Sequence, residues 1–405
     1  MQSSILLIFE IGLIIVFASI LSEFAKRLHI PSLIGAMALG LFLGGPGGIG
    51  LVINTEFMDI LASLGAVILL FITGLNFDAK FFLKSGKNAL LLTGCGFLLS
   101  LIIGVGVGLF LGWGFEYSFL LGVLISPSGT SVIASILEQR GHPSKSEGLL
   151  LTSAILDDIF TVILFSIALN LLENKATNPE GVLLVTLSSI VFVIGAIISG
   201  NEILPRVLPK IEGKVSEDFL FMLLLGFGLI LAFVASTYFG LAAMTGAFIM
   251  GAVIPVDPYG RSLAKKLSLM KDTFLSIFFV SFGISIDPAN IPILIPVSML
   301  ILTAALVGRI GGGILGGLIV GVRGREILFF ATGLAIKGEM SLIIAKEAID
   351  RGVDCVSCGS ISAIAFILIT GSILLLGPLL GRFGSKTDSI VMVEFEKQNS
   401  TADTT

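Results

Sequence analysis

Long apolar segments alternate with short polar loops along nearly the whole chain. A helix of about 20 apolar residues crosses the hydrocarbon core of a bilayer. Hydropathy predicts thirteen such segments, at approximately 4–24, 31–47, 57–75, 88–112, 117–139, 147–172, 180–200, 217–237, 240–256, 270–286, 291–321, 326–349 and 359–380. The pattern therefore predicts an all-α membrane protein with thirteen transmembrane helices and a short polar tail at 386–405.

The composition supports this class. Hydrophobic residues make up 55% of the chain and charged residues 13%, whereas a soluble domain averages about 25% charged residues. The net charge of −4 gives no reason to expect a nucleic-acid partner. The partner that this composition predicts is the lipid bilayer.

The 24 lysine and arginine residues are distributed unevenly between the predicted loops. Nineteen lie in the odd-numbered loops and the tail, and three (Lys175, Lys346 and Arg351) lie on the opposite side. The remaining two, Arg309 and Lys337, fall inside spans. Because cytoplasmic loops carry the excess of basic residues, we predict a cell-membrane protein with its N-terminus outside and its C-terminus in the cytoplasm.

Two short patterns occur twice in the same order. Gly35–Gly40 is matched by Gly246–Gly251, and the stretch that ends at Asp78 is matched by the one that ends at Asp287, with separations of 211 and 209 residues. These separations equal seven predicted helices, an odd number, so the copies have opposite orientations in the membrane. Inverted repeats of this kind are typical of secondary transporters. The predicted organisation is a first repeat at 1–172, a linker helix and loop at 173–216, and a second repeat at 217–385.

The fifth and twelfth segments correspond in the two repeats, and both are interrupted. The fifth breaks at Ser126–Thr130 (Ser-Pro-Ser-Gly-Thr) and the twelfth around Gly333–Gly338 (Gly-Leu-Ala-Ile-Lys-Gly). Irregular backbone at membrane depth is tolerated only where it is buried or lines a cavity, and matched broken helices indicate a binding site. We expect Gly129, Gly333 and Gly338 to permit the breaks; a simple kink in each segment is the alternative.

Five ionisable residues lie within spans close to the breaks: Asp157, Asp158, Arg309, Lys337 and Glu339. Each charge at the centre of a bilayer costs about 2.5–3.5 kcal/mol on insertion scales, so these residues are expected to pair. Three carboxylates and two cations leave one negative charge unmatched. A carboxylate in a water-accessible cavity can be neutralised by a proton or by a small cation, which is the chemistry of an exchange site.

Asp157 and Asp158 are expected to have different roles, because adjacent residues on a helix point about 100° apart. One can pair with a fixed cation on a neighbouring helix while the other faces the cavity. An ion-pair cluster without a role in transport is the alternative, although buried ion pairs alone stabilise proteins poorly.

Cys355 and Cys358 form a C-x-x-C pattern between the last two predicted spans. One such pair could close a small disulfide or supply half of a metal site. A turn of small residues is the interpretation that we favour.

Several of these stretches resemble one family of transporters. The segment Pro31–Pro46 is similar to the second span of the monovalent cation:proton antiporter superfamily, in its family 2 branch of sodium/proton antiporters and potassium-efflux proteins. The stretch Leu70–Asp78, the pair Asp157-Asp158, Gly308-Arg309 and Lys337–Leu342 (Lys-Gly-Glu-Met-Ser-Leu) also resemble that family. The resemblance covers residues 1 to about 385.

The resemblance implies a core domain, formed by segments 4–6 and 11–13, and a panel of segments 1–3 and 8–10 that forms a homodimer. The two broken helices would cross beside the aspartates. Their N-terminal ends would offset carboxylate charge, and their free backbone carbonyls would help to bind the cation.

The resemblance also implies a role for each aspartate. Asp158 would bind a proton or a sodium ion in turn, and Asp157, beside it at the sodium site, would pair with Arg309. Electrogenic members of the family with two aspartates usually carry Lys at the position of Arg309. Because arginine stays protonated where a buried lysine can release its proton, the sequence leaves the stoichiometry open.

The other site residues would supply ligands or charges. The resemblance implies that Thr130 and Ser131 provide oxygen ligands and that Glu339 is structural or steadies the crossing. Lys337 is a second charge partner, and it is the alternative partner for the aspartates.

The sequence thus predicts a secondary active transporter, not an enzyme, that exchanges sodium, with lithium as a further substrate, for protons. A potassium/proton antiporter of the same family is the main alternative, because the sequence hardly separates the two cations. A cation channel explains the inverted repeats less well. An intramembrane aspartyl protease would place its two aspartates on different helices. We expect no cofactor.

Overall fold

The computed structural model describes residues 2–27, 31–44, 48–50, 56–75, 79–138, 145–173, 179–211, 214–239, 241–255, 259–352 and 360–383. Asp78, Cys355, Cys358 and the tail at 386–405 lie outside the described residues, so what the sequence predicts for them stays a prediction.

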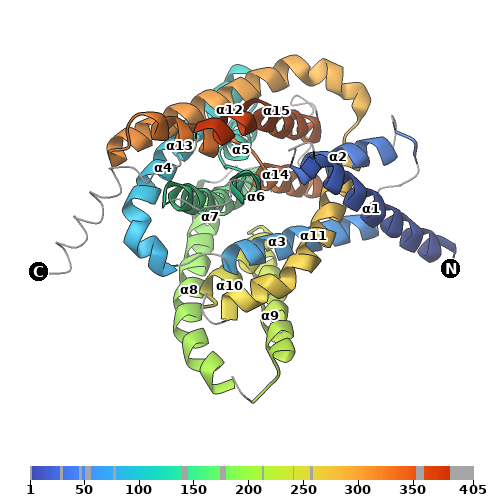
Figure 1. The fold of residues 1–405 in the computed structure, drawn as a ribbon, viewed down its shortest axis with the longest axis vertical. Coiled ribbons are helices and arrows are strands. Elements are labelled where there is room, and N and C mark those ends of the chain that lie inside the picture. Colours follow the sequence, from blue (N-terminus) through green and yellow to red (C-terminus); the bar gives the residue numbers. More distant parts are fainter. Residues whose placement is uncertain are drawn as a thin grey trace, which may run out of the picture. The chain divides into compact units, whose positions relative to one another are not determined.

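The elements in these ranges are helices, which confirms the predicted all-α class. They are α1 Gln2–Arg27, α2 Ser32–Leu43, α3 Glu56–Leu75, α4 Ala79–Phe110, α5 Phe115–Ile125, α6 Thr130–Glu138, α7 Lys145–Glu173, α8 Pro179–Ile211, α9 Glu217–Phe239, α10 Ala243–Val253, α11 Arg261–Ile284, the 3-10 helix Pro288–Asn290, α12 Ile291–Val320, α13 Arg325–Ala335, α14 Glu339–Asp350 and α15 Ile361–Phe383 (Figure 1).

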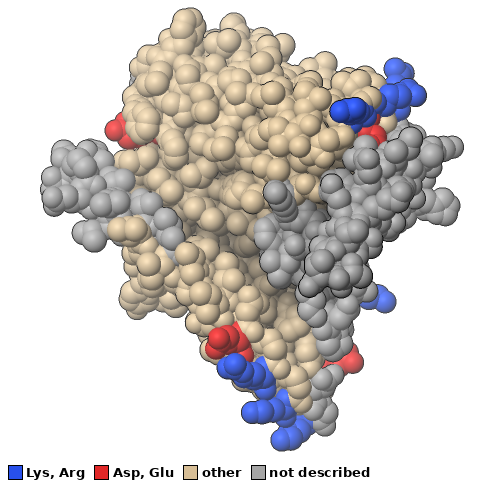
Figure 2. Space-filling model, turned by 90° about the vertical axis from the view of Figure 1, so that its left-hand side faces the viewer, with Lys and Arg blue, Asp and Glu red and all other residues tan. Residues whose placement is uncertain are grey.

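Within the described ranges, ten stretches are long and apolar enough to cross a membrane. The other three predicted spans correspond to shorter apolar helices, at Leu33–Leu43, Ala243–Val253 and Thr273–Ile284. Among the described residues on the face drawn in Figure 2, charged side chains form only small patches, as expected for a surface in contact with lipid. Every predicted segment therefore contains an apolar helix, whereas the number of complete crossings stays a prediction.

Both predicted breaks are present. The fifth segment divides into α5, which ends at Ile125, and α6, which begins at Thr130. Pro127 explains this break, because proline lacks a backbone N–H and disfavours helical backbone at the residue before it. The twelfth segment divides into α13, which ends at Ala335, and α14, which begins at Glu339.

Two of the three predicted glycines lie in the breaks, where the two chain segments touch. A Cβ atom on Gly129 would lie 2.8 Å from the Cα of Gly338, so only glycine permits this approach. The Gly129 N–H donates to the carbonyl oxygen of Ile336 at 2.8 Å. Gly333 differs from the prediction: it lies in the last turn of α13, where a Cβ would be 2.6 Å from Cδ2 of Leu150. Its small size serves packing against α7 rather than the break.

The chain forms two compact units, each drawn from both halves of the sequence. Unit 1 comprises Met1–Ala79, Val162–Leu294 and Ile343–Ala363; unit 2 comprises Lys80–Thr161, Ile295–Leu342 and Ile364–Thr405. The predicted panel segments fall in unit 1 and most of the predicted core falls in unit 2. Segments 6 and 12 differ from the expectation, because each is divided between the units within its own helix.

Close helix contacts in unit 1 occur in matched pairs. α2 meets α11 where a Cβ on Gly40 would lie 2.9 Å from the Cα of Gly283. α3 meets α10 where a Cβ on Gly74 would lie 3.0 Å from the Cα of Gly251. Gly40 corresponds to Gly251 in the predicted repeats, and Gly74 to Gly283, so one contact is made twice. Figure 1 shows α3, α10 and α11 together in this unit.

Unit 2 also contains a close helix contact that occurs once in each predicted repeat. A Cβ on Gly104 of α4 would lie 2.6 Å from the Cα of Gly122 in α5, and one on Gly313 of α12 would lie 2.9 Å from the Cα of Ala331 in α13. Gly313 lies 209 residues after Gly104, and Ala331 lies 209 residues after Gly122, so the second contact repeats the first. These contacts support the prediction of two repeats and define their register; the boundaries of the repeats stay predictions.

Candidate cation-binding site

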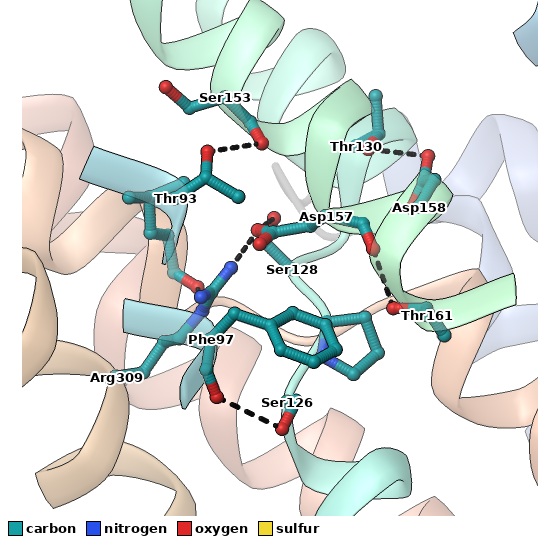
Figure 3. A network of polar contacts seen from close by, with 12 residues as sticks. Thr93, Phe97, Ser126, Ser128, Thr130, Ser153, Asp157, Asp158, Thr161 and Arg309 are labelled. Carbon is teal, nitrogen blue, oxygen red and sulfur yellow. Dashed lines mark hydrogen bonds and ion pairs between the residues drawn. The ribbon is translucent and has the colours of Figure 1, made fainter. Parts of the chain in front are cut away.

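The two aspartates lie in the part of α7 that belongs to unit 2, and both are buried. Their exposed fractions are 0% for Asp157 and 1% for Asp158. Figure 3 shows that they point to different sides of the helix, Asp157 toward Arg309 and Ser128, and Asp158 toward Thr130. The expected difference in orientation is therefore present.

Asp157 is bound by a charge and by a hydroxyl group. Its Oδ2 forms an ion pair with the Arg309 guanidinium and accepts a hydrogen bond of 2.6 Å from Ser128. Arg309 is fully buried, and its Nε donates to the Leu334 carbonyl at 3.0 Å. A Cβ on Gly96 of α4 would lie 2.8 Å from an Arg309 nitrogen, so glycine at this position leaves room for the guanidinium. Arg309 is thus the basic partner of Asp157, as the resemblance implies.

Asp158 has a neutral partner. Its Oδ2 accepts a hydrogen bond of 3.0 Å from the Thr130 hydroxyl, at the first residue of α6. Its Oδ1 is buried and has no hydrogen-bond partner within the described part of the chain. The structure therefore brings Thr130 to Asp158, as the resemblance implies.

Lys337 contacts backbone carbonyls rather than the carboxylate partner that the sequence led us to expect. This fully buried residue donates from Nζ to the carbonyl oxygens of Ile125 and Pro127, the latter at 3.0 Å. The C-terminal end of a helix carries partial negative charge, which a cation stabilises. Lys337 therefore neutralises the C-terminal end of α5. These carbonyls are already occupied, so they differ from the free carbonyls that the resemblance implies.

Glu339 makes the complementary contact at the other side of the break. Its Oε1 accepts a hydrogen bond of 2.8 Å from the Ser131 backbone N–H, at the N-terminal end of α6. This end carries partial positive charge, which a carboxylate stabilises. The structure brings Ser131 to Glu339 through its backbone, whereas the resemblance implies an oxygen ligand for the cation.

Ser128 is a site residue that the sequence analysis did not identify. It lies inside the break between α5 and α6, and its hydroxyl binds Asp157. The sequence could have indicated Ser128, because it is a hydroxyl residue in the predicted break and buried carboxylates need hydrogen-bond donors. Within the described residues, no group of three or more His, Cys, Asp or Glu side chains is arranged to hold a metal ion.

A family comparison decides what kind of protein carries this arrangement. The sequence profile of the transmembrane sodium/hydrogen exchangers matches residues 12–386. The chain belongs to this family. The predicted relationship to the cation:proton antiporters is thereby confirmed, as is the multi-pass membrane class.

Relatives of this protein in the exchanger family are named as antiporters of sodium and of potassium. It is 26% identical over 385 residues to the Na(+)/H(+)-K(+) antiporter GerN of Bacillus cereus. This match covers 93% of this chain and 96% of GerN. The chain is 24% identical over 292 residues to the K(+)/H(+) antiporter subunit KhtU of Bacillus subtilis, covering 70% of this chain and 72% of KhtU.

The fold is that of a solved exchanger. The structure of the sodium proton antiporter MjNhaP1 from Methanocaldococcus jannaschii superposes with a TM-score of 0.77, covering 95% of this chain and 98% of MjNhaP1, at 18% sequence identity. This likeness confirms the predicted antiporter fold.

Proposed function

We propose that this protein exchanges sodium for protons across the membrane by alternating access, with Asp158 binding one or the other in turn. The observation that carries the proposal is the distribution of partners among the five buried ionisable groups that lie closest to the two breaks. Asp157 pairs with Arg309, Lys337 binds the end of α5, and Glu339 binds the start of α6. Among the described residues, the one hydrogen-bond partner of Asp158 is the neutral Thr130 hydroxyl, so Asp158 is the group whose charge we expect a transported ion to neutralise.

Competition follows from this arrangement without any separate regulator. One buried carboxylate can be neutralised by a proton or by a monovalent cation, but not by both at once. A buried, uncompensated charge is unfavourable in the low dielectric of a membrane. The site is therefore expected to change its accessible side only when it is occupied, which couples the two ions in opposite directions.

Potassium/proton exchange is the second candidate. It is supported by the similarity of the chain to GerN and KhtU, whose names include potassium. Sodium stays our first choice because both MjNhaP1 and GerN are named as antiporters of sodium.

The deciding experiment measures flux with each cation separately. We expect purified protein in proteoliposomes to dissipate an imposed pH gradient when sodium or lithium is added, and not when potassium is added. Protein-free liposomes and addition of choline provide the controls. Dissipation by potassium alone would establish the second candidate, and no dissipation by any of the three cations would refute antiport.

We further propose that the protein lies in the cell membrane as a homodimer formed through the panel segments, with its N-terminus outside. The 19-to-3 distribution of basic residues supports this orientation. A cysteine at position 84 should therefore react only from the cytoplasm, and one at position 175 only from outside.

The labelling uses a variant without Cys95, Cys355 and Cys358, a membrane-impermeant thiol reagent and intact cells. Permeabilised cells provide the control, in which both positions should react. Labelling of both positions from the same side of intact cells would contradict the thirteen-span topology.

A further inference from the structure

Two carboxylates converge on the first turn of α6. Thr130 donates its hydroxyl hydrogen to Asp158 at 3.0 Å, and the next residue, Ser131, donates its backbone N–H to Glu339 at 2.8 Å. Asp158 comes from α7 and Glu339 is the first residue of α14. Consecutive residues of one helix thus bring together two acidic side chains that are 181 positions apart in the sequence.

Each carboxylate keeps one buried oxygen without a partner. Asp158 is 1% exposed and Glu339 is 4% exposed, and neither Oδ1 of Asp158 nor Oε2 of Glu339 has a hydrogen-bond partner among the described residues. The two groups contact consecutive residues at the start of α6, so their negative charges lie near each other. Buried oxygen atoms of like charge are unfavourable without a compensating group, and a hard cation with oxygen ligands is such a group.

Asp157 is adjacent to Asp158 in the sequence, but it is less suitable than Glu339 as a second ligand for the cation. Its Oδ1 also lacks a hydrogen-bond partner among the described residues, but its Oδ2 is shared by the Arg309 guanidinium and the Ser128 hydroxyl. The adjacent positive charge of Arg309 disfavours a second cation at this carboxylate.

We propose that Glu339 is a direct ligand of the transported cation, which binds between Asp158 and Glu339 rather than between Asp157 and Asp158. This inference rests on the proposed function and deepens it. The Thr130 hydroxyl oxygen, already at Asp158, is the neighbouring neutral ligand. The site then joins the start of α6 to the start of α14, so cation binding holds the two broken helices together.

A purely structural role for Glu339 makes a different prediction. A structural cap of α6 needs only one acceptor oxygen for the Ser131 N–H. Glu339→Gln keeps an oxygen acceptor of the same shape and removes the charge. It therefore separates capping from cation binding.

The test measures binding of radioactive sodium and sodium-dependent thermal stabilisation of the purified full-length protein at about pH 8.5, where protons compete less with sodium than at neutral pH. We expect Glu339→Gln to raise the Kd for sodium at least about tenfold, because one of two neighbouring negative charges is lost, while the Tm without sodium stays close to that of the wild type. Potassium is titrated in parallel.

Glu326→Gln is the matched control. Glu326 is a buried glutamate, 9% exposed, in the first turn of α13, and its Oε1 accepts a 3.3 Å hydrogen bond from Ser146. Removing this charge should leave the Kd for sodium unchanged. The comparison therefore distinguishes the effect of losing the charge at Glu339 from the effect of losing a buried glutamate charge elsewhere.

Several results would overturn the inference. A Glu339→Gln variant that binds sodium with wild-type affinity would assign Glu339 a structural role, whether or not its Tm falls. If that variant does not fold, Glu339→Asp keeps the charge and moves it by one methylene; an unchanged affinity ratio for lithium, sodium and potassium would then refute direct ligation. A wild-type protein that binds neither sodium nor potassium would instead refute the proposed function itself.

Discussion

Replacing Asp158 with Asn is expected to abolish coupled cation/proton exchange while the protein still folds. The amide has the shape of the carboxyl group but cannot release a proton or neutralise a cation, so both half-reactions are lost. The Thr130 hydroxyl can still donate to the amide oxygen, as it does to Oδ2 of Asp158. The measurement is sodium-dependent proton flux in proteoliposomes, with size-exclusion chromatography to verify folding.

The wild type provides a second measurement of the same site. Since one proton competes with one cation, the apparent KM for sodium should rise about tenfold for each pH unit below the pKa of the site. Protons bind more as the pH falls, so the affinity for sodium decreases in acid and reaches a plateau in alkali. Residual coupled exchange in Asp158→Asn, or a KM independent of pH, would place the carrier carboxylate elsewhere.

Separating the Asp157–Arg309 pair is expected to destabilise the protein strongly. Removing one partner of a buried ion pair leaves an uncompensated charge and typically costs about 3–5 kcal/mol. Both side chains are 0% exposed, so water cannot replace the missing partner. Asp157→Asn and Arg309→Ala should therefore each lower the Tm of the purified protein in detergent.

The double variant Asp157→Asn/Arg309→Met tests whether the two residues act as a pair. It removes both charges together and should recover much of the stability lost in the single variants, because no unpaired charge remains. Strong destabilisation by Arg309→Ala with an unchanged Tm for Asp157→Asn would show that the aspartate is not the stabilising partner of Arg309.

Features that depend on neighbouring residues in the chain were predictable from the sequence. Transfer of a helix into lipid has a cost that is approximately the sum over its residues, so every predicted segment contains an apolar helix. The break at Ser126–Thr130 follows from the local backbone restrictions of Pro127. The paired contacts of Gly40 with Gly283 and of Gly74 with Gly251 show that the repeat separation was also present in the sequence.

Partners of the buried charges were only partly predictable. Arg309 was named as the partner of Asp157 through a family resemblance, and the ion pair is present. Charge counting alone led to the wrong expectation for Lys337, which binds carbonyl oxygens at the end of α5. The count considered side-chain charges and omitted the partial charges at the ends of broken helices, which are themselves partners for ions.

The sequence by itself determined the multi-pass membrane class, where two helices break, and which ionisable residues lie close to the breaks. Only the tertiary structure decided that Glu339 binds the start of α6, that Gly333 packs against Leu150, and that Asp158 accepts a hydrogen bond from the Thr130 hydroxyl. The reason is physical: burial and helix breaking depend on residues close together in the chain. The partner of a buried charge depends instead on which atoms lie within about 3 Å, and here those atoms come from segments up to 212 residues apart.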